Sequence, residues 1–372
     1  MWLAYFLIIY LLALALFFYN KGRHVYYIQE NGVVNRRQKD KAFLLLSFLL
    51  LTFLACFRGP YIGTDTINYV ELFDDINIDP SLVFRFEPGF MLYVRLLNCI
   101  SDSPQIMIIT SSLFIMYSFY LFIKKYSCCV WLSVFLFFSL FFNASLNIMR
   151  QYIAIAFLLY SFDYVIRREK IKFLLLLLIA FLFHFPSIIF IIAYPLYNYS
   201  ITKQRMKLFW YSLPVIILVS MSFAVLLFSV LRNYGLFYYY SENTKYIEEG
   251  FKVASLLLLL FYLVLMSLPI KAWKIMRGDG SVNLSPVNRV CLVFGLISIV
   301  LLASSFSFNL IDRFVHYFAV YICILLPNAI YKLSARKRLI HIIILVLLLS
   351  SYYITISTLR PEWSCIYPYE FY

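Results

Sequence analysis

The chain has 372 residues, of which 63% are hydrophobic and only 13% are charged. This composition, together with apolar runs long enough to cross a bilayer, excludes a soluble globular domain and predicts an all-α polytopic membrane protein. The formal net charge of +14 does not indicate a nucleic-acid partner, because the basic residues form short clusters between the apolar runs, as they do in the loops of membrane proteins.

The apolar runs predict about twelve transmembrane helices within a single transmembrane domain, residues 1–372. The predicted spans are 2–19, 41–57, 104–123, 129–142, 148–166, 172–183, 186–200, 208–231, 252–270, 290–308, 313–331 and 339–356. The first run has no basic residue before it and no small-residue cleavage site after it, so we expect a retained span rather than a signal peptide. The seven cysteines show no metal-binding spacing, and we expect neither a metal nor a cofactor.

Residues 172–200 are too few for two full crossings of a hydrocarbon core about 30 Å thick. His184-Phe185-Pro186 lies in the middle of this segment and predicts a short, broken hairpin, because interrupted helices at membrane depth are tolerated only against protein or water. Counting it as two spans places 23 of the 32 lysines and arginines on one side. The positive-inside rule makes that side cytoplasmic, so both termini are expected outside the cytoplasm.

The longest polar passage lies between the second and third predicted spans. We expect these residues, 58–103, to form a large, folded extracytoplasmic cap loop. Gly59-Pro60 and Gly63 end the preceding helix, and Thr64-Asp65-Thr66 predicts the N-cap of a short helix that begins near Asn68. Further acidic residues of the loop are interpreted as a solvated surface: Asp74, Asp75 and Asp79.

Ionisable side chains in or beside membrane spans are costly unless they pair or face water, so each marks a candidate functional position. Six of them converge on the extracytoplasmic side of the predicted topology: Arg58, Asp65, Glu87, Arg150, His184 and Arg313. Guanidinium groups bind phosphate oxygens bidentately, so the three arginines suit a substrate diphosphate. A carboxylate or a histidine can act as general base toward a hydroxyl acceptor, which makes the other three the candidate catalytic residues.

Each of these residues also has an ordinary structural explanation. Arg58 and Arg150 can extend from span ends to the interface, and Arg313 can pair with its neighbour Asp312. The two carboxylates can cap helices, and a lone histidine is often a hydrogen-bonded core residue. Three arginines on the side that the positive-inside rule depletes favour a functional role.

Motifs at these positions resemble the EpsG family of Wzy-like polysaccharide polymerases. They are Arg58 with IGTDTINY (62–69), EPGF (87–90), RQYIAIAF (150–157), LLLLLIAFLFHFPSIIF (174–190), DRFVHYF (312–318) and the terminal PYEFY (368–372). The resemblance implies a GT-C-like glycosyltransferase that polymerises undecaprenyl-diphosphate-linked oligosaccharide repeat units. The transfer would be inverting and metal-independent, on the extracytoplasmic face of the bacterial inner membrane.

The partners expected from this resemblance are a lipid-linked oligosaccharide donor and acceptor, the lipid bilayer, a chain-length regulator and a flippase, and no nucleic acid. Three alternatives stay open at this point: an O-antigen-type ligase, a flippase of lipid-linked oligosaccharide, and a membrane acyltransferase acting on glycans with His184 as base. A flippase should carry charges along a cavity open to both sides, and an acyltransferase would take its donor from the cytoplasm. The six ionisable residues are instead expected near the extracytoplasmic face, which argues against both of these alternatives.

Overall fold

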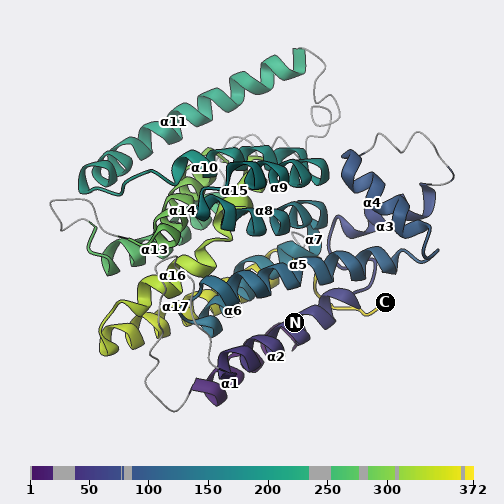
Figure 1. Ribbon diagram of the computed structural model, residues 1–372, viewed down its shortest axis with the longest axis horizontal. Coiled ribbons are helices and arrows are strands. Elements are labelled where there is room, and N and C mark those ends of the chain that lie inside the picture. Colours follow the sequence, from purple (N-terminus) through teal and green to yellow (C-terminus); the bar gives the residue numbers. More distant parts are fainter. Residues whose placement is uncertain are drawn as a thin grey trace. The chain divides into compact units, whose positions relative to one another are not determined.

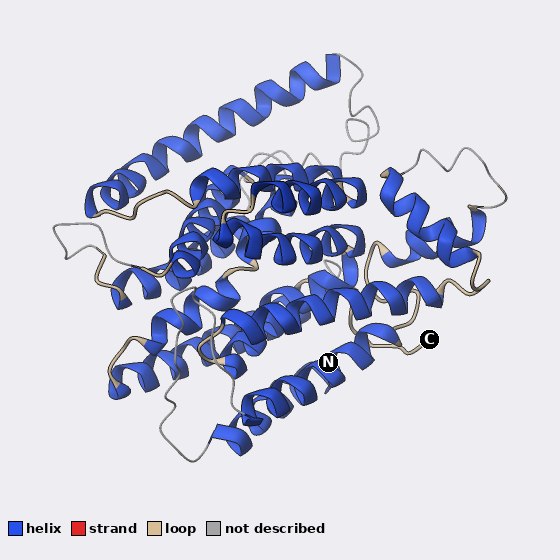
Figure 2. Ribbon diagram, in the orientation of Figure 1, coloured by secondary structure: helices blue, strands red, loops and turns tan. Residues whose placement is uncertain are grey.

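The computed structural model describes residues 2–19, 38–76, 78, 86–233, 253–275, 284–305, 310–361 and 365–372. Every regular element in these ranges is a helix, so the predicted all-α class is confirmed (Figure 1, Figure 2). By its internal contacts the chain divides into two compact units, Met1–Tyr194 with Ser334–Tyr372, and Pro195–Leu333.

The first unit contains the N-terminal helices and the C-terminal one. In chain order it holds α1 (Trp2–Tyr19), α2 (Gln38–Cys56), α3 (Thr66–Asp75), α4 (Pro88–Asn98), α5 (Gln105–Tyr126), α6 (Val130–Phe137), the π-helical η2 (Phe138–Phe142), α7 (Asn143–Asn147), α8 (Met149–Arg167), α9 (Lys170–Phe183), the 3₁₀ helix η3 (Phe185–Ile192) and α17 (Ala335–Leu359). The chain leaves this unit within α10 (Ala193–Leu196).

The second unit is built around α14. It contains α11 (Lys203–Asn233), α13 (Val253–Ala272), α14 (Pro286–Ser304), α15 (Leu310–Ala319) and α16 (Ile322–Tyr331). Helix α14 packs against each of the other four, and a buried hydrogen bond from Asn328 to the Asn288 side chain, 2.9 Å long, ties α16 to α14.

Each of the twelve predicted spans overlaps a helix of the structure. Six helices in the described ranges are long and apolar enough to cross a membrane: α1, α5, the continuous Val130–Asn147 run, Ser255–Ala272 of α13, α14 and α17. Helices α15 and α16 form a seventh if their 44° bend is one broken span. Helices suit this chain because an apolar environment offers backbone N–H and C=O groups no partner other than the backbone itself.

The predicted break in the 172–200 segment is confirmed. Helix α9 ends at Phe183, His184 is extended with φ −158° and ψ 105°, and η3 follows. Pro186 lacks a backbone N–H and therefore cannot continue the α9 ladder. The interruption places Phe185 at the first position of η3, where its backbone N–H has no acceptor within the helix and a side chain can accept its hydrogen bond.

The core of the first unit is a row of three helices in which α8 lies between α5 and α9 (Figure 1). Aromatic rings fill the contacts, with Phe114 of α5 and Phe183 of α9 both packing on Phe157 of α8, at centroid distances of 4.8 and 5.5 Å. Helix α4 crosses α9 at Gly89. This crossing sets the position of Glu87, two residues before the glycine.

The C-terminal tail, residues 365–372, returns to the residues that follow α2. The N–H groups of Gly63, Gly59 and Tyr372 donate to the carbonyls of Cys365, Glu370 and Phe57 at 3.2, 2.9 and 3.0 Å. Arg58 and Phe371 form an isolated antiparallel bridge between the same segments. The tail is therefore an integral part of the first unit.

Replacing Gly89 by Ala should destabilise the first unit. A Cβ at this position would lie 2.8 Å from the Cβ and carbonyl oxygen of Leu182, so α4 and α9 would have to separate. We expect a loss of about 1–3 kcal/mol, typical of overpacking, measured by equilibrium unfolding in mixed detergent micelles.

The matched control is Gly295→Ala in α14. The atoms nearest its added Cβ are Sδ and Cε of Met266, at 2.5 Å, and this flexible side-chain end can move aside. An equal loss of stability in both variants would contradict the close crossing of α4 and α9.

Candidate functional site

Glu87 and Arg150 form an ion pair that joins three separate segments of the first unit. A guanidinium NH group of Arg150 donates to Glu87 Oε2, and the side chains are only 16% and 8% exposed. The other carboxylate oxygen, Oε1, accepts the backbone N–H of Phe185 at 3.3 Å. Both oxygens of Glu87 are thus used to bind α8 and the break after α9 to the start of α4.

Local sequence explains why Glu87 lies where it does. Pro88 occupies the first turn of α4, where its missing N–H costs nothing, and Glu87 precedes it in extended conformation with φ −61° and ψ 142°. Its side chain does not cap α4. The alternative explanation of Glu87 as a helix cap therefore does not hold, because its carboxylate bonds Arg150 instead. Its predicted catalytic role stays a prediction.

Three aromatic rings surround the Arg150 guanidinium. Its Cζ lies 4.1 Å from the ring centroid of Phe86, 5.7 Å from that of Tyr69 and 5.8 Å from that of Phe90. The Arg150 Nε also donates to the Tyr69 hydroxyl at 3.4 Å. Ring faces attract a cation, more strongly where water is excluded. Among the described residues, Glu87 supplies the one carboxylate paired with this cation.

His184 lies directly before the residue that binds Glu87. Its side chain is buried, with 6% exposed, and its backbone N–H and carbonyl bond Ala180 and Ser187 at 2.9 Å each. Three of the six predicted positions, Glu87, Arg150 and His184, thus belong to one assembly of α4, α8 and the α9–η3 break.

Asp65 belongs to the loop that joins α2 to α3. Helix α3 begins at Thr66, two residues before the predicted start, and Asp65 occupies the N-cap position without a side-chain capping bond. The loop is instead fastened to Asn147, whose Oδ1 accepts Thr64 Oγ1 at 2.8 Å and the Asp65 N–H at 2.9 Å. Asn147 ends α7, three residues before Arg150.

Gly63 permits this close approach of loop and helix. Its φ of +95° is strained for other residues, and a Cβ there would lie 3.1 Å from the Asn147 Cα. The half-buried residue Asp65 therefore lies on a loop whose position depends on the Gly63 conformation and on the hydrogen bonds to Asn147.

Arg58 is enclosed in the first unit. It is 1% exposed, and its NH1 group donates to the Ala55 carbonyl at 2.6 Å and to Ser112 Oγ at 2.8 Å. Burial lowers the pKa of Arg58 to about 10, against a smaller opposing effect of Tyr369, so the group stays charged at neutral pH. These contacts link the end of α2 to α5.

Arg313 lies in the second unit, on α15, between Asp312 and His316 in one helical turn. It is half-buried. Its predicted role in binding a diphosphate stays a prediction.

In the described part of the chain, no group of three metal-binding side chains comes together. Of the acidic residues predicted to be solvated, Asp74 and Asp75 are exposed on α3, and Asp79 lies outside the described residues. The partial desolvation of the Asp74 carboxyl and, to a smaller extent, the negative charge of the adjacent Asp75 raise the pKa of Asp74.

Sequence reasoning did not assign a role to the aromatic rings or to Asn147. Tyr69 is the last residue of the IGTDTINY motif and Phe86 directly precedes EPGF. The sequence feature that could have identified them is therefore their position in or next to the motifs that contain Asp65 and Glu87. Asn147 stands three residues before Arg150, where an amide in an apolar segment needs a hydrogen-bond partner.

The fold and the described site define an integral membrane protein in which α-helices carry buried, paired charges at the ends of apolar segments. The EpsG family profile matches residues 41–371, which is most of the chain and includes all six candidate residues. The protein belongs to the EpsG family. No curated protein and no solved structure matches the chain.

The Arg150–Glu87 pair should be energetically coupled. Removing one partner of a buried pair leaves an uncompensated charge, so Arg150→Met and Glu87→Gln should each cost about 3 kcal/mol. The double variant should cost about 2 kcal/mol less than the sum of the two. The measurement is a double-mutant cycle of equilibrium unfolding in mixed micelles.

Lys172 and Glu169 supply the control cycle. Their pair is 2.5 Å long, but the side chains are 61% and 33% exposed, so solvent screening should leave no measurable coupling. Strictly additive losses at Arg150 and Glu87 would rule out the coupling.

Proposed function

We propose that this protein is a polysaccharide polymerase that joins undecaprenyl-diphosphate-linked oligosaccharide repeat units on the extracytoplasmic face of the bacterial inner membrane. Membership of the EpsG family supports the class of reaction. The observation that carries the proposal is the Arg150–Glu87 pair within its aromatic surround. It provides a cation and a carboxylate side by side, which are the two groups that a metal-independent glycosyl transfer requires.

In the proposed reaction, a hydroxyl oxygen of the acceptor unit attacks the anomeric carbon of the donor glycan. The new glycosidic bond forms as the bond from that carbon to the donor diphosphate breaks, and undecaprenyl diphosphate leaves with the bonding electrons. A base takes the hydroxyl proton. Attack opposite the leaving group inverts the anomeric centre in one displacement and requires no covalent enzyme intermediate.

Arg150 has the capacity to bind the diphosphate. A guanidinium carries five N–H donors, and in the described part of the chain its hydrogen bonds to Glu87 and Tyr69 use two of them. The remaining donors can form charge-assisted bonds to phosphate oxygens and stabilise the charge that develops on the leaving group.

Diphosphate binding would also change the state of Glu87. An anion on Arg150 competes with the carboxylate for the same guanidinium, so Glu87 is released to accept the proton of the acceptor hydroxyl. Asp65, half-buried on the loop beside Asn147, and His184, buried at the α9–η3 break, are the alternative bases.

The other two arginines have different roles in this proposal. The buried contacts of Arg58 with Ala55 and Ser112 favour a role in holding the loop that carries Asp65. Arg313 is proposed as a further diphosphate ligand, and only its own variant can test that role.

Arg150→Lys should reduce polymerisation by about 100-fold or more. Lysine keeps the charge but loses the planar fork that binds phosphate oxygens, and loss of one preorganised donor to a developing anion has effects of this size. The measurement is the length distribution of lipid-linked glycans in cells whose own gene is deleted and replaced by each variant. Glu87→Gln and Arg313→Lys are measured in the same way.

The matched control for this assay is Arg95→Lys, an exposed arginine in the last turn of α4, which should make polymer of normal length. Single repeat units should accumulate on the outer leaflet in the deletion strain and with Arg150→Lys. Accumulation on the cytoplasmic leaflet would indicate a flippase instead, and full-length polymer retained on its carrier lipid would indicate a ligase.

The proposed topology, with twelve spans and the 58–103 loop outside, predicts which cysteines a membrane-impermeant maleimide reaches. Cys99 and Cys365 are exposed, and the other five cysteines are buried. Both exposed thiols should be labelled in right-side-out vesicles and protected in inside-out ones. Labelling of only one of them in each preparation would contradict the shared outer location.

A further inference from the structure

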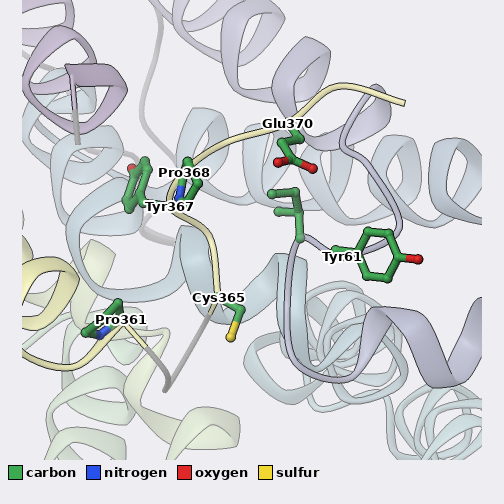
Figure 3. A pocket seen from close by; sticks show the side chains of 7 residues that line it. Tyr61, Pro361, Cys365, Tyr367, Pro368 and Glu370 are labelled. Carbon is green, nitrogen blue, oxygen red and sulfur yellow. The ribbon is translucent and has the colours of Figure 1, made fainter.

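The C-terminal tail and the loop after α2 line a cavity of about 290 Å³ in the first unit that is open at the surface. The tail side contributes Pro361, Cys365, Tyr367, Pro368 and Glu370, and the loop side contributes Tyr61 and Ile62. Figure 3 shows the labelled side chains of the tail following one another along the cavity, with Tyr61 carried by the separate loop segment. The volume is near the lower end for small-ligand sites, so it suits a ligand the size of a sugar ring.

The cavity walls are held by the structure and need little ordering when a ligand binds. Gly63 and Gly59 bond the carbonyls of Cys365 and Glu370 on either side of the cavity. The Tyr367 hydroxyl lies 2.6 Å from the Tyr353 hydroxyl, which donates to Asn143 Oδ1 at 3.1 Å. Burial raises the pKa of Tyr367 to about 12, so that hydroxyl stays protonated. A preformed site loses less affinity to conformational entropy.

The lining chemistry favours a neutral, hydroxyl-rich ring. Tyrosine and proline rings offer flat apolar faces that can cover the C–H face of a sugar. The Glu370 carboxylate is exposed, has no ion pair in the described part of the chain, and can accept hydroxyl hydrogens. Among the described residues, no lysine or arginine lines the cavity, which disfavours a phosphate, and the carboxylate disfavours an acyl chain.

The cavity is connected through the loop backbone to the candidate site. Ile62 and Gly63 lead directly to Asp65, and that loop is bonded to Asn147, three residues before Arg150. The two places suit the two parts of a lipid-linked substrate. The cation Arg150 suits the anionic diphosphate, and the cavity, which is lined by rings and a carboxylate, suits the neutral sugars.

We infer that this cavity is a glycan-binding subsite that holds a sugar ring of the lipid-linked oligosaccharide, with Tyr61 against the ring face and Glu370 accepting its hydroxyls. The inference rests on the proposed function for the identity of the glycan. Such a subsite would fix the register of the glycan chain relative to Arg150 and Glu87.

The test uses Cys365 as a reporter, because it lines the cavity and its thiol is exposed. The probe is the water-soluble oligosaccharide released from lipid-linked repeat units of the producing cells. Added to the full-length protein in detergent at up to about 10 mM, a concentration that detects even weak binding, it should slow maleimide labelling of Cys365. Cys99, also exposed but not in the cavity, should label at an unchanged rate.

Two surface variants tie protection to the lining. Glu370→Gln and Tyr61→Ala should each raise the oligosaccharide concentration needed for half-protection by about tenfold, as loss of a charge-assisted hydrogen bond or a ring contact does. Glu71→Gln, which changes an exposed carboxylate of α3, should leave that concentration unchanged. Tyr61 is 69% exposed, so its loss should not disturb folding.

Absence of protection by the oligosaccharide, or equal protection by inorganic pyrophosphate, would overturn the subsite. This readout requires no turnover, so it is separate from the test of the proposed function. Protection in a protein that fails to polymerise would retain the subsite and reject the polymerase, whereas polymerisation without protection would do the reverse.

Discussion

The arrangement of the first unit depends on compensating one guanidinium charge inside an apolar chain. Arg150 is held near the start of α8 by Glu87 and by three aromatic rings, because an unpaired charge in such surroundings would cost about 3 kcal/mol, a large fraction of the stability of a typical domain. Glu87 can reach it only if α4 lies close against α9, which Gly89 permits. Its second oxygen then accepts the backbone N–H of Phe185, which the break after α9 leaves without an acceptor in a helix. One ion pair therefore requires a glycine, a proline and an interrupted helix.

A second buried arginine organises the loop side of the same unit. Arg58 donates to Ala55 and Ser112 and pairs its backbone with Phe371 of the tail. The last residues of the chain thereby hold the segment that continues to Gly63 and Asp65. Asp65 is bonded to Asn147, three residues before Arg150, so the tail supports the loop that lies next to the start of α8.

Much of the helical layout could be predicted from sequence, because periodic apolar runs and proline breaks are local signals. The interruption at His184 and the overlap of every predicted span with a helix follow from such signals. The number of membrane crossings does not follow from such local signals. Helices α2 and α8, for example, overlap predicted spans but are not among the six helices long and apolar enough to cross a membrane.

The six candidate residues were chosen for a shared predicted side of the membrane, and such a choice does not predict which side chains form pairs. Glu87 and Arg150 are 63 positions apart, and their contact depends on how closely α4 crosses α9. The same limit explains Arg58, which has the sequence signal of a substrate ligand but whose side chain the structure encloses. Periodicity cannot separate a buried structural arginine from a catalytic one. The acceptors around each guanidinium become known only from the folded structure.

The groups around the Arg150 guanidinium affect both the stability of the fold and the number of N–H donors left for a ligand. A guanidinium saturated by protein acceptors would be stable but inert, whereas one lacking acceptors would destabilise the fold. Arg150 lies between these extremes, because ring faces stabilise its charge without occupying its N–H donors. Aromatic rings thus keep donors available to an anionic substrate while a single carboxylate maintains the fold. The diphosphate binding that we propose, without a metal, would need this balance, since the cation must be present before the substrate arrives.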